Sequence, residues 1–588
     1  MNGFYGKYLC IELTNRTFTI KPIAEQVLVR YLGGKGLAAY LLTELNPPGV
    51  DPLAAENTLI FATGPLGNSM IWGSCRYGVY TKSPLTGLFA ESYCGGKTPD
   101  AIDTAGFDAV VIQGCAAEPT VLVVHPEGAD FHLADDIWGM ETYAAEDAVR
   151  ERFARPEYRK KGAVVVGPAA ENGVRFAVVE TDRWRSAGRT GAGTVMGAKK
   201  LKGILFTGNR KRSQSDPDGI KKFAKNFMNT FKDHAAANAY KNLGTPMLVK
   251  MTNEAGAFPT RYWQQGTFEH WEQISADALI RQCRVKPNAC SKCFMACGQL
   301  STVKNGRHAD LTIEGPEYET IYAFGGLCMI DDIEEIAYLN DICDRLGMDT
   351  ITAGNLCAFT IEAARRGKVD FKIDYGDVDV VANLLFIIAR REGVGDVLAE
   401  GIRHASKVWA LEDIAVHVKG MEPAGYDPRP LKGMGLAYGT SDRGACHLRA
   451  TFYKPELTGM IPPEQIEGKA ELFLEFESRL TVFDMMVLCR FYRDFYLWDR
   501  LEEMIGLVTG LEASEKILKE KALDVANLIR RFNLREGMTP QDDRLPKFLH
   551  QPLQDTGEVI TEDEMETMLK DYYRLHGWDD NGIPTKID

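Results

Sequence analysis

The sequence is short of several features that would assign it to whole classes of protein. No stretch of its 588 residues is apolar over the length of a membrane span, and the opening MNGFYGKYLCIELTNRTFTI has no apolar core of signal-peptide length. Positive charge is also scarce: the formal net charge is −13, whereas general nucleic-acid and anionic-membrane binders need a dominant basic surface. We therefore expect a cytoplasmic protein with no membrane span and no nucleic-acid partner.

A disulfide framework is also missing. The 13 cysteines are an odd number scattered through a long chain, unlike the paired cysteines of small secreted domains. The clustered ones are typical of metal ligands, and most others of small buried apolar residues. A hydrophobic fraction of 45% and a charged fraction of 25% are those of an ordinary globular protein. At 588 residues the chain should form two or three domains and can bury a large cofactor.

The chain changes character near residue 208. Before it, short β-type runs alternate with Gly, Pro and Asn turns, namely KYLCIEL, NTLIFATG, YGVYTKS, AVVIQG, TVLVVH, GAVVVG and KGILFTG. The polar stretch GNRKRSQSDPDG, residues 208–219, is typical of a linker. Beyond it the apolar spacing becomes helical, as in DIEEIAYLNDICDRLG, where Gly347 is placed as a C-cap.

We predict three domains in an α+β arrangement. The first, residues 1–208, is rich in β-strands, and the second, residues 209–418, and the third, residues 419–588, are mainly helical. The boundary near residue 418 rests on VKGMEPAGYDPRPLKGMG, whose prolines and glycines a helix would not tolerate. NLLFIIARREGVGDVLAEGIRHASKVWA, KAELFLEFESRL and LDVANLIRRFNL are expected to be helical.

The strongest single motif is the triplet CSKCFMACG, which contains Cys290, Cys293 and Cys297. A structural zinc and an iron–sulfur cube both normally take four ligands, so a remote fourth ligand is needed. The spacing CxxCxxxC does not match paired CxxC zinc knuckles, and no His lies in the loop to complete a zinc site. The motif favours iron–sulfur over zinc.

Three glycine-bearing stretches of the first domain suggest phosphate binding: YLGGKGLAAYLL at 31–42, SYCGGKTPDAI at 92–102 and RSAGRTGAGTVMGAKKLKG at 185–203. Glycines let backbone N–H groups approach an anion, and nearby Arg or Lys supply charge. None has the Walker spacing, which excludes a typical nucleotide-hydrolysing loop. Ordinary tight turns are the alternative for each loop alone.

Several isolated polar residues have an ordinary structural interpretation. A carboxylate at a helix end, such as Asp344, Asp349 or Asp484, is most often a cap or a surface group. Glu319 in EGPEYET and His447 in RGACHLR are equally ambiguous when each is taken alone.

Taken together, the order and spacing of these segments resemble the tungsten-containing aldehyde:ferredoxin oxidoreductase family over essentially the whole chain. The matches are GKYLCIELTN, GPLGNSMIWGSCRYGVYTKSPLTG, WRSAGRTGAGTVMGAKKLKGI, the cysteine triplet, EGPEYET, DRLGMDT, AGYDPR with RGACH, and the segment that ends in Cys489. The resemblance implies that Cys489 is the fourth ligand of a [4Fe–4S] cluster. It also implies a first domain of two β-sheets that form a saddle under two pyranopterins, with two helical domains closing over them.

The resemblance implies a cofactor of two pyranopterins whose dithiolene sulfurs hold one tungsten or molybdenum. Phosphates need Arg and backbone N–H donors, and pterin rings need acceptors such as Asp. The residues that would meet the pterin phosphates, or the Mg²⁺ between them, are Arg76, Tyr93, Gly95, Arg185, Ser186 and Arg449. Those at the positions of the family's pterin-ring contacts are Asp344, Met348, Asp349, Asp484 and Leu488.

Glu319 and His447 correspond to the family's acid/base pair. The implied reaction is aldehyde plus water to carboxylic acid, with two electrons passed through the cluster to ferredoxin or to a small iron–sulfur subunit. Glu319 would deprotonate the water, and His447 would polarise the carbonyl oxygen. The substrate would be a small aldehyde and the product its acid. A homo-oligomer or a hetero-complex is compatible with the sequence.

Five departures from the family pattern stand out. Tyr93 replaces an Asn that helps to hold Mg²⁺ in the family. Val487 replaces the glycine of DxxGLC, and Met348 replaces the leucine of DxxGLD. The family's ExxH iron site at the dimer interface aligns with Tyr338 and Asp341, which lack the His ligand, so we predict no bridging iron.

The fifth departure is Cys328 in FGGLCMIDD, where aldehyde oxidisers commonly have an apolar residue. A cysteine ligand to the metal is a feature of the tungsten subunit of aromatic acyl-CoA reductases in this superfamily, so Cys328 is a candidate metal ligand. The alternative is a buried apolar cysteine, and we predict that Cys328 lines the pocket without coordinating. The competing functions are therefore an acyl-CoA ring reductase subunit or a related superfamily member, and an electron-transfer or scaffolding subunit without catalysis.

Overall fold

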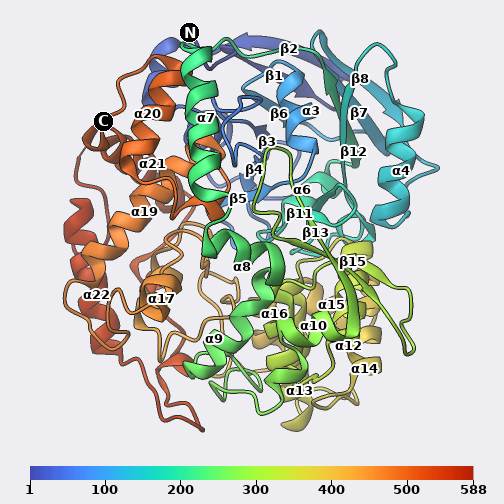
Figure 1. The fold of residues 1–588 in the computed structure, drawn as a ribbon. Coiled ribbons are helices and arrows are strands. Elements are labelled where there is room, and N and C mark those ends of the chain that lie inside the picture. Colours follow the sequence, from blue (N-terminus) through green and yellow to red (C-terminus); the bar gives the residue numbers. More distant parts are fainter. Residues whose placement is uncertain (587–588) are drawn as a thin grey trace. The chain divides into compact units, whose positions relative to one another are not determined.

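The β-type runs of the first part form two six-stranded mixed sheets, drawn from blue to teal in Figure 1. The first sheet has the strand order β2-β1-β6-β3-β4-β5 and the second β11-β10-β9-β12-β7-β8. In sequence order the strands of the first are β1 (Lys7–Glu12), β2 (Thr17–Pro22), β3 (Leu59–Ala62), β4 (Tyr77–Lys82), β5 (Phe89–Cys94) and β6 (Ala109–Gln113). Those of the second are β7 (Thr120–His125), β8 (Gly128–Leu133), β9 (Lys160–Val165), β10 (Val179–Thr181), β11 (Arg185–Ala187) and β12 (Leu201–Gly208).

The computed structural model describes residues 1–586, and their contacts divide the chain into two units. The first unit comprises Met1–Asn238, Ala289–Ala296 and Ser478–Gly537, and the second comprises Ala239–Asn288, Cys297–Glu477 and Met538–Asp588. Each unit is thus built from segments far apart in sequence. The predicted domains, in contrast, are continuous stretches of sequence with boundaries at residues 208 and 418, and this division stays a prediction.

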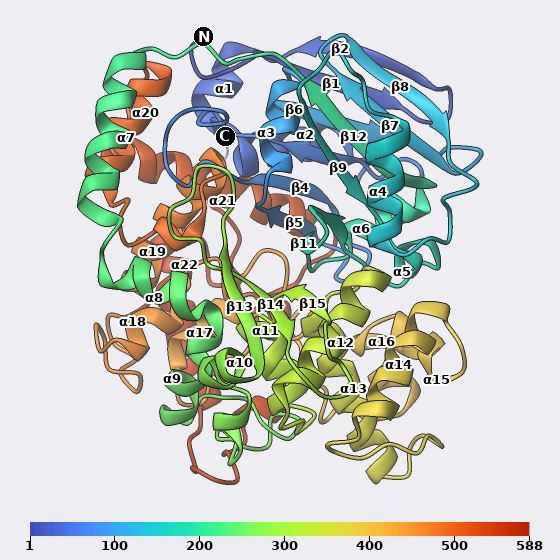
Figure 2. The same ribbon diagram turned by 45° about the vertical axis from the view of Figure 1, so that its right-hand side comes forward.

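Several helices of the first unit pack on the two sheets (Figure 2). On the first sheet, α2 (Gly34–Leu45) contacts β3 and β4 and also α21 (Glu515–Arg535). On the second, α3 (Thr98–Thr104) and α4 (Thr142–Arg152) both contact β9 and β12. The core between α4 and this sheet is fully aliphatic, with Val121, Val149 and Leu205 at 0% exposure. β-Branched residues suit such a pleated, buried surface, which is why the runs are strands.

The first unit wholly contains five further α-helices. They are α1 (Glu25–Tyr31), α5 (Pro168–Glu171), α6 (Ala192–Ala198), α7 (Pro217–Phe231) and α20 (Trp498–Thr509). The predicted linker ends where α7 starts, because the side chain of Asp216 accepts a hydrogen bond from the Gly219 N–H and caps the helix. One helix, α8 (Ala235–Leu243), and one long helix, α19 (Lys469–Met486), contain a boundary between the two units.

The second unit is mainly helical, and α12, α13 and α14 contact one another in it (Figure 1). Its helices are α9 (Leu248–Glu254), α10 (Ala276–Gln282), α11 (Tyr318–Thr320), α12 (Ile333–Leu346), α13 (Thr350–Arg365), α14 (Val378–Arg390), α15 (Val394–Ala399), α16 (Ile402–Val408), α17 (Lys432–Thr440), α18 (Tyr453–Leu457) and α22 (Glu562–His576). Gly347 ends α12 with φ 77°, as the C-cap prediction requires.

The second unit also contains a three-stranded antiparallel sheet that the sequence analysis did not predict: β13 (Cys283–Asn288), β14 (Gly298–Val303) and β15 (Thr312–Glu314). The loop between β13 and β14 carries the cysteine triplet. Among residues 1–586, no helix is both long and apolar enough to cross a membrane.

Candidate active site

Two of the triplet cysteines meet the remote Cys489 through backbone contacts in the first unit. The N–H of Cys489 donates to the carbonyl of Gly73 at 2.9 Å, and the N–H of Gly73 donates to the carbonyl of Lys292 at 3.0 Å. The Ser291 N–H in turn donates to the carbonyl of Gly96 at 3.0 Å. The loops of Cys290, Cys293 and Cys489 are therefore fixed to the segments on either side of β4 and β5.

The sulfur atoms of these cysteines lie among hydrogen-bond donors. Arg76 Nη2 lies 3.5 Å from the Cys489 sulfur, and the Gly96 N–H lies 3.2 Å from the Cys290 sulfur. The Tyr492 hydroxyl lies 3.5 Å from the Cys293 sulfur. Cationic and N–H donors around sulfur favour thiolates, which are the ligands of an iron–sulfur cluster.

The charge balance favours the same conclusion. The hydrogen bond that Cys290 shares with Cys75 lowers the pKa of the Cys290 thiol, and the positive charges of Arg185 and Arg76 lower this pKa further against the effect of burial. Cys75 was not among the predicted site residues, although it directly precedes Arg76. Its position in GSCRYG, one of the matching segments, was the available signal.

The glycine at position 95 allows the close approach of Cys290. A Cβ atom at residue 95 would lie 2.9 Å from the Cys290 sulfur, tighter than real Cβ contacts allow, and 3.5 Å from the guanidinium carbon of Arg76. Cys297 is the last residue of this loop and belongs to the second unit. The set of four cluster ligands thus stays a prediction. Three of the four, Cys290, Cys293 and Cys489, have hydrogen-bond donors next to their sulfurs.

A cluster site is distinct from a site for a single ion. Among the residues that the structure describes, no group of three or more His, Cys, Asp or Glu side chains stands where it could hold a metal ion. The four thiolates of an iron–sulfur cube each bind a different iron and do not converge on one ion. The support for a cluster at these cysteines therefore comes from the hydrogen-bond donors around their sulfurs.

Arg76 also offers a test of whether an anionic group fits beside the cysteines. Its Nε atom is buried and has no hydrogen-bond partner in residues 1–586, although Nη2 contacts Cys489. A buried guanidinium donor without a partner costs free energy, and an anionic oxygen would satisfy it. The pterin phosphate predicted for Arg76 and Arg185 fits this donor set. Arg185 is half-buried and Ser186 is exposed on β11.

The three glycine stretches are explained largely by close packing. A Cβ at Gly34 would lie 2.1 Å from the carbonyl oxygen of Asp484, and one at Gly191 would lie 2.1 Å from that of Arg175. The N-terminus of α3 is occupied by a carboxylate, because Asp182 accepts hydrogen bonds from the Lys97 and Thr98 N–H groups at 2.6 and 3.0 Å. This helix end is therefore not free for a phosphate.

Tyr93, which replaces the magnesium-binding Asn of the family, forms a hydrogen bond with a residue of its own strand, β5. Its hydroxyl donates to Glu91 Oε2 at 2.6 Å, while Lys35 Nζ lies 3.2 Å from Glu91 Oε1. Arg490 covers the Tyr93 ring, with its guanidinium carbon 5.2 Å from the ring centroid, and it also pairs with Asp484. Leu488 is buried nearby in sequence. The role of Asp484 toward a pterin stays a prediction.

The second unit brings Glu319 and His447 together. His447 Nε2 lies 3.4 Å from Glu319 Oε1, and the Gly425 N–H donates to Glu319 Oε2 at 3.0 Å. Glu319 lies on α11, which continues into a wide helical turn over Ile321–Gly326 of the kind often found at functional sites. The histidine side chain is 10% exposed and the glutamate 19%, so both are largely buried.

Tyrosines surround this pair. The rings of Tyr426 and Tyr453 are stacked with centroids 4.0 Å apart, and their centroids lie 5.6 and 6.2 Å from that of His447. The Tyr318 hydroxyl donates to the carbonyl of Gly425, the residue whose N–H holds Glu319. The aromatic rings pack beside the imidazole, and the Gly425 N–H fixes the carboxylate.

The other predicted residues of the second unit occupy helix ends and a buried cationic region. Asp349 caps α13, since Oδ1 accepts from the Ile351 N–H at 3.1 Å and Oδ2 from the Thr352 hydroxyl at 2.9 Å. Asp344 Oδ2 accepts from Asn340 at 2.7 Å, and burial raises the pKa of Asp344 well above its usual range. Met348 and Arg449 are buried.

Cys446, next to His447, is a residue that the sequence analysis missed. Its sulfur lies 3.0 Å from Arg443 Nη2 and 3.3 Å from the Leu448 N–H. Burial alone would raise the pKa of the Cys446 thiol, but the charges of Arg443 and Arg449 outweigh it and lower this pKa from 9.0 to about 6. The spacing of the two arginines in DRGACHLR was the available signal.

Cys328 is fully buried and contacts carbonyl oxygens of its own unit. Its sulfur lies 3.6 Å from the carbonyl oxygen of Ala323 and 3.5 Å from that of Gly354. Burial raises the pKa of this thiol well above its usual range. These surroundings are those of a neutral buried thiol.

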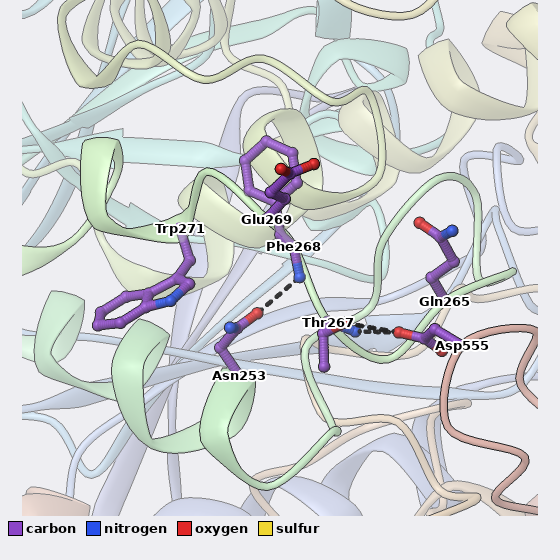
Figure 3. Close-up of a pocket in the computed structure, with 7 residues that line it drawn as sticks. All are labelled: Asn253, Gln265, Thr267, Phe268, Glu269, Trp271 and Asp555. Carbon is purple, nitrogen blue, oxygen red and sulfur yellow. Dashed lines mark hydrogen bonds between the residues drawn. The ribbon is translucent and has the colours of Figure 1, made fainter.

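A separate hollow of about 320 Å³ in the second unit contains none of the predicted residues (Figure 3). It is lined by Asn253, Gln265, Thr267, Phe268, Glu269, Trp271 and Asp555. Asp555 Oδ2 accepts from the Thr267 N–H at 2.9 Å and from its hydroxyl at 2.7 Å, and Asn253 Oδ1 accepts from the Phe268 N–H at 2.7 Å. Asn253 and Asp555 thus hold the loop that forms the hollow.

Comparison with known proteins assigns the family. The model of the aldehyde ferredoxin oxidoreductase N-terminal domain matches residues 8–208, and that of domains 2 and 3 matches residues 222–587. The tungsten-containing aldehyde ferredoxin oxidoreductase of Pyrococcus abyssi is 33% identical, over 99% of this chain and 97% of its own length. The enzyme of the same name from Pyrococcus furiosus is 31% identical over the same shares.

A solved structure shares the fold. The active-site complex BamBC of benzoyl coenzyme A reductase, bound to 1,5-dienoyl-CoA, superimposes with a TM-score of 0.85 at 23% identity, over 100% of this chain and 96% of that one. At this identity the likeness concerns the fold alone. On the family models and the identities to the Pyrococcus enzymes, this chain is a member of the aldehyde ferredoxin oxidoreductase family of oxidoreductases.

Proposed function

We propose that this protein oxidises aldehydes to carboxylic acids. Each turnover consumes one aldehyde and one water and releases the acid, two protons and two electrons, which leave one at a time through a [4Fe–4S] cluster to ferredoxin or to a small iron–sulfur subunit. The single observation that carries the proposal is the pairing of Glu319 with His447 at 3.4 Å in a family of this chemistry.

The geometry gives each side chain a separate role. The Gly425 N–H holds Glu319 Oε2 at 3.0 Å, so the carboxylate is oriented before substrate binds. A carboxylate fixed in this way can take a proton from water as the water attacks the aldehyde carbon. The His447 imidazole lies beside it and can donate a hydrogen bond to the carbonyl oxygen, where negative charge develops.

The tyrosines around His447 support this division. The stacked Tyr426 and Tyr453 rings present apolar faces near the imidazole. Exclusion of bulk water strengthens the hydrogen bonds inside the site and keeps the attacking water in place. A small aldehyde has few polar groups and suits such an aromatic surface.

A bis-pyranopterin tungsten or molybdenum centre would accept the two electrons of the substrate. Arg76, with a buried Nε atom that lacks a partner, and the half-buried Arg185 would hold its phosphates, and Asp344, Asp349 and Asp484 are proposed to face its rings. Tyr93 donates its hydroxyl proton to Glu91, so it does not supply the amide oxygen that the family's Asn offers to magnesium between the phosphates.

Reduction of an aromatic acyl-CoA thioester is the second candidate, and Cys328 is the observation that bears on it. The neutral, carbonyl-bonded thiol of Cys328 supports aldehyde oxidation, because a metal ligand would have to be a thiolate. X-ray absorption at the metal edge distinguishes the two candidates. A metal–sulfur bond that disappears in Cys328→Ser would favour the reductase.

Activity measurements on anaerobically purified protein test the proposal. We expect aldehyde-dependent reduction of a viologen dye, with one tungsten or molybdenum and a full cluster per chain by metal analysis. Dye-dependent turnover of an aromatic acyl-CoA thioester, with no response to a panel of aliphatic and aromatic aldehydes, would reject it. A metal-free protein that binds only a redox partner would instead indicate a subunit without catalysis.

A further inference from the structure

The cysteine loop reaches the surface of the first unit. Cys293 and the next residue, Phe294, are only half-buried. Two contacts hold the loop against a neighbouring segment of the same unit: Lys292 Nζ lies 3.4 Å from Asn68 Oδ1, and the Gly73 N–H donates to the Lys292 carbonyl at 3.0 Å. A cluster bound to these cysteines would therefore lie close to the surface at this loop.

Apolar side chains lie at the same part of the surface. Met70 stands in sequence between the two contact points and is 55% exposed. Trp72 is half-buried, and its ring packs edge-on against that of Phe294 with the centroids 5.5 Å apart. Methionine and aromatic residues are enriched at the centres of protein–protein interfaces, where polar residues form the rim.

Helix α7 packs on these aromatic residues with its inner side. Trp72 Nε1 donates to the carbonyl of Ala224 at 3.0 Å, and the ring centroid of Phe227 lies 6.1 Å from that of Phe294. Both Ala224 and Phe227 are buried residues of α7. A single layer of aromatic rings thus separates this helix from the cysteine loop.

The outer side of α7 is basic. Lys221, Lys222 and Lys225 are exposed and lie within about one helical turn. Lys221 pairs with Asp218 at 2.9 Å, whereas Lys222 and Lys225 have no ion pair or hydrogen bond among residues 1–586. Because the whole chain has a net charge of −13, an acidic partner is attracted to a local group of lysines and repelled by most of the remaining surface.

Resting on the proposed function, we propose that Met70, Trp72, Phe294 and the three lysines of α7 form a docking surface for the electron acceptor, a small acidic iron–sulfur protein. The apolar side chains form its centre, and the lysines steer the partner and hold its rim. In each of two encounters per aldehyde, the reduced cluster passes one electron to the oxidised centre of the partner. The cluster is oxidised, the partner is reduced, and no bond forms or breaks.

The test compares two electron acceptors of the full-length holoenzyme. An acidic [4Fe–4S] ferredoxin needs a docking surface, whereas a small viologen dye does not. Lys222→Glu/Lys225→Glu reverses two charges without losing an ion pair, and Glu has a helix propensity close to that of Lys. We expect kcat/KM for the ferredoxin to fall about tenfold at low salt, with a smaller loss as the ionic strength rises. Aldehyde-dependent dye reduction should stay unchanged.

The matched control is Lys21→Glu/Lys516→Glu, which reverses two exposed lysines of the same unit outside the docking surface. It should leave the ferredoxin kinetics close to those of the wild type. Met70→Gln tests the apolar centre without a change of charge. We expect a smaller fall in kcat/KM for the ferredoxin that persists at high salt, again with normal dye reduction.

Every other outcome decides for or against the surface. Equal ferredoxin kinetics in the α7 variant and the control overturn the proposal. Binding of anionic lipid vesicles that the α7 variant loses, with unchanged ferredoxin kinetics, also overturns it and assigns the lysines to a membrane. If the α7 variant does not fold, a wild-type ferredoxin rate that is independent of salt contradicts the proposal. If the wild type reduces no dye with any aldehyde, the proposed function fails, and calorimetry of ferredoxin binding to the same variants still tests the surface.

Discussion

The cysteine region of the first unit and the glutamate–histidine pair of the second unit are stabilised in different ways. Around Cys290 and Cys489, backbone hydrogen bonds and glycines set the positions of the sulfurs, and Gly73 and Gly95 leave room for close approach. Around Glu319 and His447, side chains dominate, with tyrosine rings packed against the imidazole. A site that holds a large rigid group needs a fixed backbone, whereas a site that moves protons needs oriented side chains.

The comparison predicts that loss of one sulfur disables electron exit and leaves the proton chemistry untouched. Cys489→Ala removes a proposed cluster ligand, and we expect the reduced-cluster signal and ferredoxin reduction to disappear. Iron analysis and paramagnetic resonance measure the change. A full four-iron cluster in this variant, with no substitute ligand, would contradict the assignment. Lower solubility alone decides nothing, because metal binding and folding are coupled.

The converse change should stop turnover and spare the cluster. Glu319→Gln and His447→Asn each remove a proton-transfer group, and such groups typically contribute about 10²–10⁴-fold to rate. We expect losses of that size in aldehyde-dependent dye reduction with pterin, metal and iron contents unchanged. The controls Glu412→Gln and His404→Asn change exposed residues of the same types. Near-normal rates in both site variants would refute the assigned roles.

A smaller effect should follow from filling the space beside Cys290. Gly95→Ala places a Cβ 2.9 Å from the Cys290 sulfur, and overpacking of this kind costs about 1–3 kcal/mol. We expect lower iron content and a lower melting temperature. Gly506→Ala is the control, since the Leu511 carbonyl oxygen lies 3.9 Å from the added Cβ, an ordinary van der Waals distance. Equal iron content and stability in the two variants would show that the backbone near Cys290 is not tightly fixed.

The smallest effect at neutral pH concerns Cys446. Its pKa is lowered from 9.0 to about 6, so its thiolate contributes stability that is full above pH 9 and is lost as the pH falls through about 6. The contribution is on the order of 1 kcal/mol at pH 7 and larger at pH 9. We expect the difference in free energy of unfolding between wild type and Cys446→Ser to shrink as the pH falls from 9 to 6. A difference that does not vary with pH would exclude a native thiolate.

The fold was predictable where the chain carries apolar runs with a clear period. All the predicted β runs are strands. Short runs with apolar residues at alternating or continuous positions favour a strand over a helix. The strand β2 was missed, since each of its residues is exposed and no apolar pattern marks it. The hairpin of β13 and β14 was missed for a similar reason: its sequences CRVKPN and GQLSTV are half polar. Glycines at 393 and 401 split one predicted helical stretch into α14, α15 and α16.

The residues of the site could be predicted where they lie in a recognisable motif, but the long-range contacts that support them could not. The pairing of Glu319 with His447 follows from the resemblance, but its support by Gly425 depends on a long-range contact that no local pattern encodes. Likewise, Asp182 occupies the end of α3 from a distant strand connection. Val487 keeps the left-handed backbone of the glycine that it replaces, with φ 55°, although such a conformation is strained for a β-branched residue.

One measurement tests most directly whether the two regions divide the work of aldehyde oxidation. Wild type and Glu319→Gln are prepared anaerobically, and the reduced-cluster signal is recorded after dithionite and, separately, after an aldehyde. The wild type should give the signal with both reductants, and Glu319→Gln should give it with dithionite only. A signal of equal size in Glu319→Gln after aldehyde, formed at the wild-type rate, would contradict the account.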